Sequence, residues 1–237
     1  MKCPDYERRS LLVTSAKLAV AAASMGTVSI ALGQGKNDKT PKKSEQKEEE
    51  IGPTEDLMRE HGVLNRVLLI YDHFVYQIDQ KKDFKPELLT ASSMIIRNFV
   101  EDYHEKQEEQ FLFPRFEQAN VLTDLVTVLK TQHQAGRRLT DRVMTLAKSS
   151  SAGDKNEIAQ SLRQFVRMYR PHEAREDTVL FPELRVSPHE FDALGEHFED
   201  NEHKQFGADG FELYRDKVAD IEKQLGIYDL SHCTPKL

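Results

Sequence analysis

The sequence predicts an all-α protein, an antiparallel up-down four-helix bundle with an additional C-terminal helix. Charged residues make up 31% of the 237-residue chain, which has only 11 Gly, 9 Pro and no Trp. This composition is typical of a helical protein with a solvated surface. Apolar residues recur at steps of three and four along four segments, without strand-like alternation. Four such helices joined by short turns favour a bundle.

The first two helices follow from their apolar faces and their prolines. The first begins near Thr54, and its buried face is predicted to contain Leu57, His61, Leu64, Leu68, Tyr71 and Val75. The second begins at Pro86, because proline suits a first helical turn. It should end at or near Pro114, because proline removes a helical amide donor.

The third helix is expected over about 122–148 and the fourth over about 156–185, with the turn-forming SSSAGD between them. Pro171 should kink the fourth helix or force a wide turn just before His172. The sequence SPHE, which begins at Ser187, predicts a capping box and the start of a fifth helix. GADG interrupts that helix, which should cap the bundle or pack alongside it.

The N-terminal region differs in composition from the rest of the chain. Arg8 and Arg9 precede an Ala-rich apolar stretch, and residues 1–33 resemble a twin-arginine signal peptide. An uncleaved membrane anchor is the alternative, but Lys17 makes this stretch a poor membrane span. Residues 34–53 carry Lys, Glu and Ser with few apolar side chains, which predicts a flexible charged linker.

The remaining boundaries place the bundle at 54–185 and a C-terminal helical extension and tail at 186–237. The signal predicts a periplasmic or otherwise exported protein without a membrane association in its mature form. The net charge of −7 argues against a nucleic-acid partner. Cleavage would remove Cys3 and leave Cys233 alone, which excludes an intramolecular disulfide and a cysteine-based metal site. No protein partner can be named from the sequence.

One sequence motif occurs twice, as HEKQEEQFLFPRF from His104 and as HEAREDTVLFPEL from His172, 68 residues apart. In each copy a Glu follows the His by four residues, at Glu108 and Glu176. On a helix the two side chains lie about 40° apart on one face, one turn from each other. The pair therefore offers an imidazole nitrogen and a carboxylate to one point. FVEDY and FVRMY extend the match upstream, and Leu-Phe-Pro follows each copy as an apolar anchor.

Two helices that each direct a His and a Glu inward are typical of a two-metal carboxylate site in a bundle. The other two helices supply His61 and His133, and successive gaps between the four histidines are 43, 29 and 39 residues. One His at mid-height on each helix can therefore meet the others at one level. The predicted metal ligands are His61, His104, Glu108, His133, His172 and Glu176. Imidazole and carboxylate ligands favour iron, manganese or zinc over magnesium and calcium.

On these motifs the chain resembles the hemerythrin-like, or HHE cation-binding, domain over about residues 54–185. Four His and two Glu are similar to the bacterial subgroup that includes di-iron proteins tied to repair of iron–sulfur clusters. The resemblance implies two iron ions, each with two His ligands, bridged by Glu108 and Glu176. It also implies a small ligand of the centre, which would be oxygen, peroxide or nitric oxide.

One position departs from the oxygen-carrying members of the family, and a second leaves the choice of the fourth-helix carboxylate open. Those carriers place a second His one turn after the first on the third helix, where this chain has Arg137. The departure implies a more open metal and disfavours simple oxygen carriage. The carriers also use an Asp on the fourth helix, where this chain has Asp177. We prefer Glu176 over Asp177 as the ligand because Glu176 mirrors Glu108 in the repeat.

Other polar residues receive simpler interpretations. His73 lies about 120° around the helix from His61 and is not an expected ligand. The surface histidines are expected to be His189, His197, His203 and His232, with His203 near the site only if the fifth helix crosses it. Tyr103 and Tyr169 are expected in the core, or as hydrogen-bond donors to a bridging carboxylate. Glu105, Glu109 and Glu173 are expected to be solvated charges.

Three functions fit these features. The first is a di-iron protein that binds or consumes a small oxidant, or handles iron under stress. The second is a passive metal-binding or sensing module without turnover. The third is a structural bundle in which the metal only stabilises the fold. Turnover separates the first from the second, and a folded apo-protein argues against the third. Export disfavours a direct role in repairing cytoplasmic iron–sulfur clusters.

Overall fold

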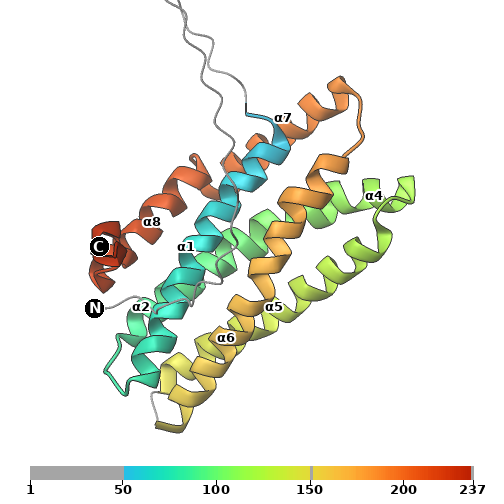
Figure 1. Ribbon diagram of the computed structural model, residues 1–237. Helices are drawn as coiled ribbons and strands as arrows, with labels where there is room; N and C mark the ends of the chain where they lie inside the picture. Colours follow the sequence, from blue (N-terminus) through green and yellow to red (C-terminus); the bar gives the residue numbers. More distant parts are fainter. Residues whose placement is uncertain (1–50, 150–151, 236–237) are drawn as a thin grey trace, which may run out of the picture. The chain divides into compact units, whose positions relative to one another are not determined.

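The computed structural model describes residues 51–149 and 152–235, and every regular element in these ranges is helical (Figure 1). The predicted all-α class is therefore confirmed. The predicted signal peptide, and the predicted linker up to residue 50, lie outside the described residues. Within the described ranges, each helix is too short or too polar to cross a bilayer.

The first helix agrees with the prediction, and the second is longer than predicted. Helix α1 spans Pro53–Asp79. The second helical run consists of α2 (Pro86–Ile95), the π-helical η1 (Ile96–His104), α3 (Glu105–Gln107), the π-helical η2 (Glu108–Leu112) and α4 (Phe113–Ala119). The prediction that Pro114 ends this run is wrong, because Pro114 lies in the first turn of α4, where a helix needs no amide donor. Asn120, in the left-handed conformation, ends it instead.

The third and fourth helices form the other half of the bundle. Helix α5 spans Thr123–Ser149, and α6 spans Ala152–Arg175, followed by the π-helical η3 (Glu176–Leu180) and the 3₁₀-helical η4 (Phe181–Glu183). Pro171 does not produce the predicted wide turn before His172. Helix α6 continues through Pro171 while packed against α1 and α5, and the wide turn comes after His172, at η3. Tertiary packing thus outweighs the hydrogen bond that the proline removes.

The repeat in the sequence is also a repeat in the backbone. Segment η2 begins at Glu108 and η3 begins at Glu176, and each ends at the leucine of Leu-Phe-Pro. In an α-helix, a proline ring clashes with the carbonyl group four residues earlier. The wide π turns before Pro114 and Pro182 relieve that clash. Single π turns inside α-helices are frequent at functional sites.

Two apolar clusters fill the space between the helices. The larger cluster contains residues of both FVxxY segments, among them Phe99, Tyr103, Phe165 and Tyr169. The smaller cluster contains both Leu-Phe pairs, which are Leu112 with Phe113 and Leu180 with Phe181. In each copy the His and Glu lie along the chain between the two apolar segments. The predicted ligands therefore occupy a polar layer with apolar side chains on both sides.

The C-terminal region contributes two helices to the same core. Helix α7 (Pro188–Phe206) begins with the predicted capping box at Ser187 and ends at Gly207, where φ is 70°. Helix α8 (Gly210–Leu225) follows, and a short 3₁₀ turn, η5, spans Leu230–Cys233. Helix α7 adds Phe198 to the smaller cluster, and α8 adds Tyr214 and Val218 to the larger one. These helices thus share the core of the bundle and cover part of its surface (Figure 1).

We expect Gly136→Ala to lower the free energy of unfolding by about 1–3 kcal/mol, because overpacking of a filled interior costs this much. A Cβ atom at Gly136 would overlap the hydroxyl group of Tyr169, whereas one at Gly62 meets nothing within 4 Å. Gly62→Ala is the matched control and should raise stability by roughly 0.5–1 kcal/mol. Urea unfolding of the two variants and the wild type measures both effects. Equal stability of Gly136→Ala and wild type would contradict this packing argument.

Candidate metal centre

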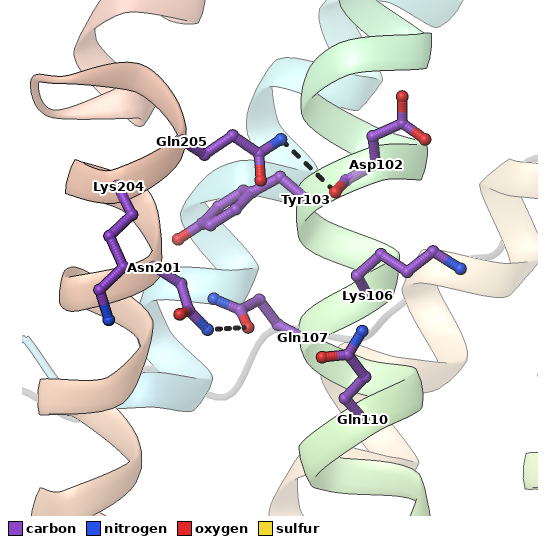
Figure 2. A pocket seen from close by; sticks show the side chains of 8 residues that line it. All are labelled: Asp102, Tyr103, Lys106, Gln107, Gln110, Asn201, Lys204 and Gln205. Carbon is purple, nitrogen blue, oxygen red and sulfur yellow. Dashed lines mark hydrogen bonds between the residues drawn. The ribbon is translucent and has the colours of Figure 1, made fainter.

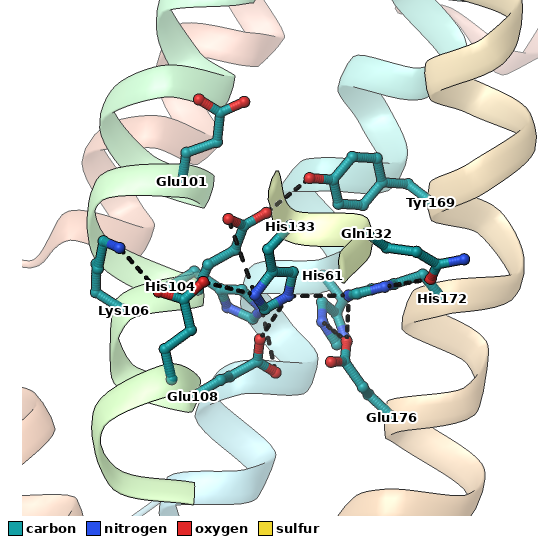
Figure 3. Close-up of polar contacts among 12 residues, drawn as sticks. His61, Glu101, His104, Lys106, Glu108, Gln132, His133, Tyr169, His172 and Glu176 are labelled. Atoms are coloured by element: carbon teal, nitrogen blue, oxygen red, sulfur yellow. Dashed lines mark hydrogen bonds and ion pairs between the residues drawn. The ribbon is translucent and has the colours of Figure 1, made fainter. Parts of the chain in front are cut away.

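All six predicted ligands lie together in the polar layer (Figure 3). His61, His104 and Glu108 form one group, and His133, His172 and Glu176 form a second group. Within each group the potential ligand atoms lie within 4.8 Å of one another. All six side chains are buried, with exposed fractions of 4% or less. Four separate helical runs thus deliver one His each to the same level of the bundle.

The two glutamates connect the groups. Oε1 of Glu108 lies 3.7 Å from Nε2 of His104, and its Oε2 lies 3.5 Å from Nε2 of His133. Oε2 of Glu176 lies 3.4 Å from Nε2 of His61 and 3.2 Å from Nε2 of His172. Each carboxylate therefore approaches one histidine of each group. This is the placement expected of a carboxylate that bridges two ions.

The donor atoms fit a pair of bound cations. Nε2 of His61 and all four carboxylate oxygens of Glu108 and Glu176 are buried without a hydrogen-bond partner, and such unpaired burial is costly. In the described part of the chain, no Lys or Arg forms an ion pair with either glutamate. The Nε2 atoms of His133 and His172 are 3.2 Å apart. Two nitrogens at about 2.1 Å from one ion and at right angles lie about 3 Å apart.

The outward nitrogen, Nδ1, of each of the four predicted histidine ligands already has a hydrogen-bond partner. Nδ1 bonds join His61 to Asp177 (2.7 Å), His104 to Glu60 (2.6 Å), His133 to Glu109 (3.1 Å) and His172 to Gln132 (2.9 Å). Because each partner atom is a carboxylate or amide oxygen, Nδ1 carries the hydrogen and donates it. The lone pair then lies on Nε2, which faces the centre of the layer. Such outer bonds fix the tautomer and the ring orientation of histidine ligands in metal sites.

These outer partners follow a simple rule that the sequence analysis missed. Each one is the sequence neighbour of a predicted ligand on an adjacent helical run. Glu60 and Gln132 directly precede His61 and His133, and Glu109 and Asp177 directly follow Glu108 and Glu176. The available signal was therefore a polar residue beside each ligand. Glu176 approaches the inward nitrogen of His61, whereas Asp177 contacts its outward nitrogen.

Burial controls the electrostatics of the layer. It raises the pKa of Glu108 well above the usual value, and the charge of Glu176 raises it further. Burial lowers the pKa of His104 and of His133, which keeps both imidazoles neutral and able to offer a lone pair. Burial also disfavours a charged His61, but the hydrogen bond to Asp177 and the nearby carboxylate of Glu176 outweigh it and raise its pKa to about 9. Two buried carboxylates in one layer thus create a local demand for positive charge.

Arg137 does not reach the centre of the layer, and it pairs with two outer acids. Its guanidinium lies 2.7 Å from Glu105 and 2.8 Å from Glu109. Burial raises the pKa of Glu105 to about 8, against the opposing charge of Arg137. Glu105, Glu109 and His133 also lie close enough to hold a cation, but Arg137 already forms ion pairs with both carboxylates. The expectation that Glu105 and Glu109 are solvated charges is therefore wrong.

Other expectations are corrected or confirmed in the same region. Glu173, also expected to be solvated, is only 4% exposed. Tyr169 donates a 2.6 Å hydrogen bond to Glu105, so it does not contact a bridging carboxylate. Tyr103 lies in the core and donates to the carbonyl oxygen of Phe198 at 3.4 Å. His73 is buried outside both groups, and the exposed histidines are His189, His203 and His232, while His197 is half-buried.

The helical fold and the paired His/Glu groups define a helical metal-binding protein. The sequence matches the family described as the Hemerythrin HHE cation binding domain over residues 52–184. This match covers more than half of the chain, and the protein belongs to that family.

Relatives of similar length extend this likeness over nearly the whole chain. The protein is 48% identical over 235 residues to uncharacterized proteins of Mycobacterium bovis and of two Mycobacterium tuberculosis strains, CDC 1551 and H37Rv. These matches cover 96% of this chain and 91% of each relative. No solved structure gives a significant match.

We expect Glu60→Ala to weaken metal binding by about 10- to 100-fold, because loss of an outer partner frees the ring it orients. Here the freed ring is His104, whose Nδ1 lies 2.6 Å from Glu60. Glu55→Ala removes an exposed carboxylate from the same helix and serves as the control. Competition with a chromogenic chelator measures the affinity. An affinity equal to that of the control would show that Glu60 does not orient His104.

Proposed function

We propose that the protein binds a non-haem centre of two iron ions, and that this centre binds or reacts with oxygen, peroxide or nitric oxide. The proposed ligands are His61, His104, Glu108, His133, His172 and Glu176. The observation that carries the proposal is the convergence of four Nε2 atoms on two bridging carboxylates, with every Nδ1 atom held from outside. Membership of a cation-binding family supports it. Manganese or zinc would suit the same atoms.

The side chains divide the work in a definite way. His61 and His104 would hold one ion, His133 and His172 the other, and Glu108 and Glu176 would bridge them. Two irons would supply redox equivalents and a binding position for the small ligand. The outer carboxylates would stabilise positive charge on the imidazoles when the two irons change their oxidation state. The apolar clusters on both sides keep bulk water from the layer.

The mutual packing of α1, α2, α5 and α6 supports the predicted antiparallel up-down bundle.

The apolar core argues against the third function, in which the metal only holds the bundle together. The larger apolar cluster includes side chains that are completely buried, such as Val67, Leu68 and Phe74. Because this burial does not involve the predicted ligands, we infer a fold that forms without metal. A passive binding or sensing module remains the alternative, and turnover of peroxide or nitric oxide separates it from the first function.

The proposal includes export to the periplasm or beyond by a twin-arginine route. It is supported by Arg8 and Arg9 and by the apolar stretch that follows them. A twin-arginine route moves folded chains, so the two metals would be loaded before export. Handling of iron, or removal of an oxidant under stress, fits such a location.

The direct test is the metal content of protein purified without oxygen, with an absorption spectrum before and after air. We expect two irons per chain and a new absorption band after exposure to air. His104→Ala should lose metal while its circular dichroism remains helical, because the apolar clusters do not depend on this side chain. His73→Ala, which removes a buried histidine outside both groups, should keep its metal. One zinc or no metal in the wild type, or full metal content in His104→Ala, would refute the proposed site.

Export is tested by replacing Arg8 and Arg9 together with lysine, which keeps the charge and removes the arginine pair that the route recognises. We expect the variant to stay in the cytoplasm as an uncleaved precursor, whereas the wild type appears in the periplasm in a shorter form. Cell fractionation and immunoblotting measure the two pools. A mature variant in the periplasm would show that a different route is used.

A further inference from the structure

Four seams surround the polar layer, and each seam is the line of contact between two neighbouring helical runs. Helix α7 covers the first seam, which lies between α1 and the run of η1 and η2. At the side of η1 and η2, Asn201 donates a 3.1 Å hydrogen bond to Gln107, and Gln205 donates to the carbonyl oxygen of Asp102 (Figure 2). A groove of about 400 Å³ remains there, and its lining includes Lys106 and Lys204. Helix α7 and its hydrogen bonds to the second helical run thus cover this seam.

The next two seams are closed by single large side chains. Between η1–η2 and α5, the guanidinium of Arg137 forms ion pairs with Glu105 and Glu109 and adds a positive charge. Between α5 and α6, the hydroxyl group of Tyr169 packs directly against Gly136, with no space for even a Cβ atom. A metal cation approaching through these seams would meet a fixed charge or a packed ring.

The fourth seam, between α1 and the run of α6 and η3, has the opposite character. The carboxylate of Asp177 is 33% exposed and reaches His61 Nδ1 at 2.7 Å. Deeper in the seam, Glu173 is only 4% exposed, and its Oε2 is buried without a hydrogen-bond partner. On α1 the seam is bordered by exposed Asn65, which lies against Glu173, and by exposed Gly62. Within residues 51–149 and 152–235, no Lys or Arg pairs with either acid.

We propose that metal cations reach the centre through the α1–α6 seam, with Asp177 and then Glu173 as successive carboxylate contacts before His61 and Glu176. The inference rests on the proposed metal site and adds its loading route. A partly exposed acid in front of a buried acid, one oxygen of which has no hydrogen-bond partner, forms a graded attraction for a divalent ion. Clefts lined by charge of one sign raise the association rate of oppositely charged ligands by a factor of 10 to 1,000.

The test compares two substitutions of equal charge on opposite sides of the layer. Asn65→Lys places an ammonium at the mouth of the acidic seam. Gln134→Lys places one on α5, also at an exposed position and directly beside His133. The probe is cobalt(II), whose visible absorption reports coordination, mixed in a stopped-flow instrument with the metal-free full-length protein. Each experiment gives a rate of uptake and a final number of ions per chain.

We expect Asn65→Lys to slow cobalt(II) uptake roughly tenfold at low ionic strength, with the same final content, while Gln134→Lys keeps the wild-type rate. Glu173→Gln should also slow uptake without changing the content. Added salt should reduce these differences, since it screens exposed charges. Equal rates for the two lysine variants, whether slowed or not, would overturn the route alone. A wild type that binds no cobalt(II) or iron would overturn the proposed function as well.

Discussion

The repulsion between the buried carboxylates of Glu108 and Glu176 is the constraint on which the rest of the structure depends. Neither has a Lys or Arg partner in the described part of the chain, and their oxygens lack hydrogen bonds. Buried acids in this situation require cations or protons. The four histidines face them with Nε2 atoms that the outer hydrogen bonds orient, and Arg137 forms ion pairs with two acids further out without entering the layer.

The apolar clusters give this constraint its strength. Segments rich in Phe and Tyr pack on one side of the layer, and the Leu-Phe pairs pack on the other. The ring of Phe113 stacks near His133 and that of Phe181 near His61, with centroids 5.5 Å and 5.9 Å apart. Electrostatic interactions are stronger where water is excluded. The apolar part of the repeated motif thus excludes water from the layer that contains its His and Glu.

Most of the fold and all six clustered side chains could be predicted from helical periodicity, the repeated motif and one histidine on each remaining helix. Periodicity gives the faces of isolated helices, but it does not give the final rotation and packing of each helix. For this reason Glu105 and Glu173 were expected in solvent and are buried. The expected wide turn directly before His172 and the expected helix end near Pro114 also failed, because α6 continues through Pro171 and Pro114 lies in the first turn of α4. The outer partners could not be predicted, since each bond crosses between helices far apart in the sequence.

The outer bonds run in one direction around the bundle, and this has a consequence for assembly. His104 is held from α1 by Glu60, and His172 is held from α5 by Gln132. Each helical run therefore carries one inward histidine and also the hydrogen-bond partner of the histidine on the next run. A partly assembled chain that lacks one docked run loses a ligand and leaves another unbraced. Tight metal binding would therefore require the completely assembled bundle.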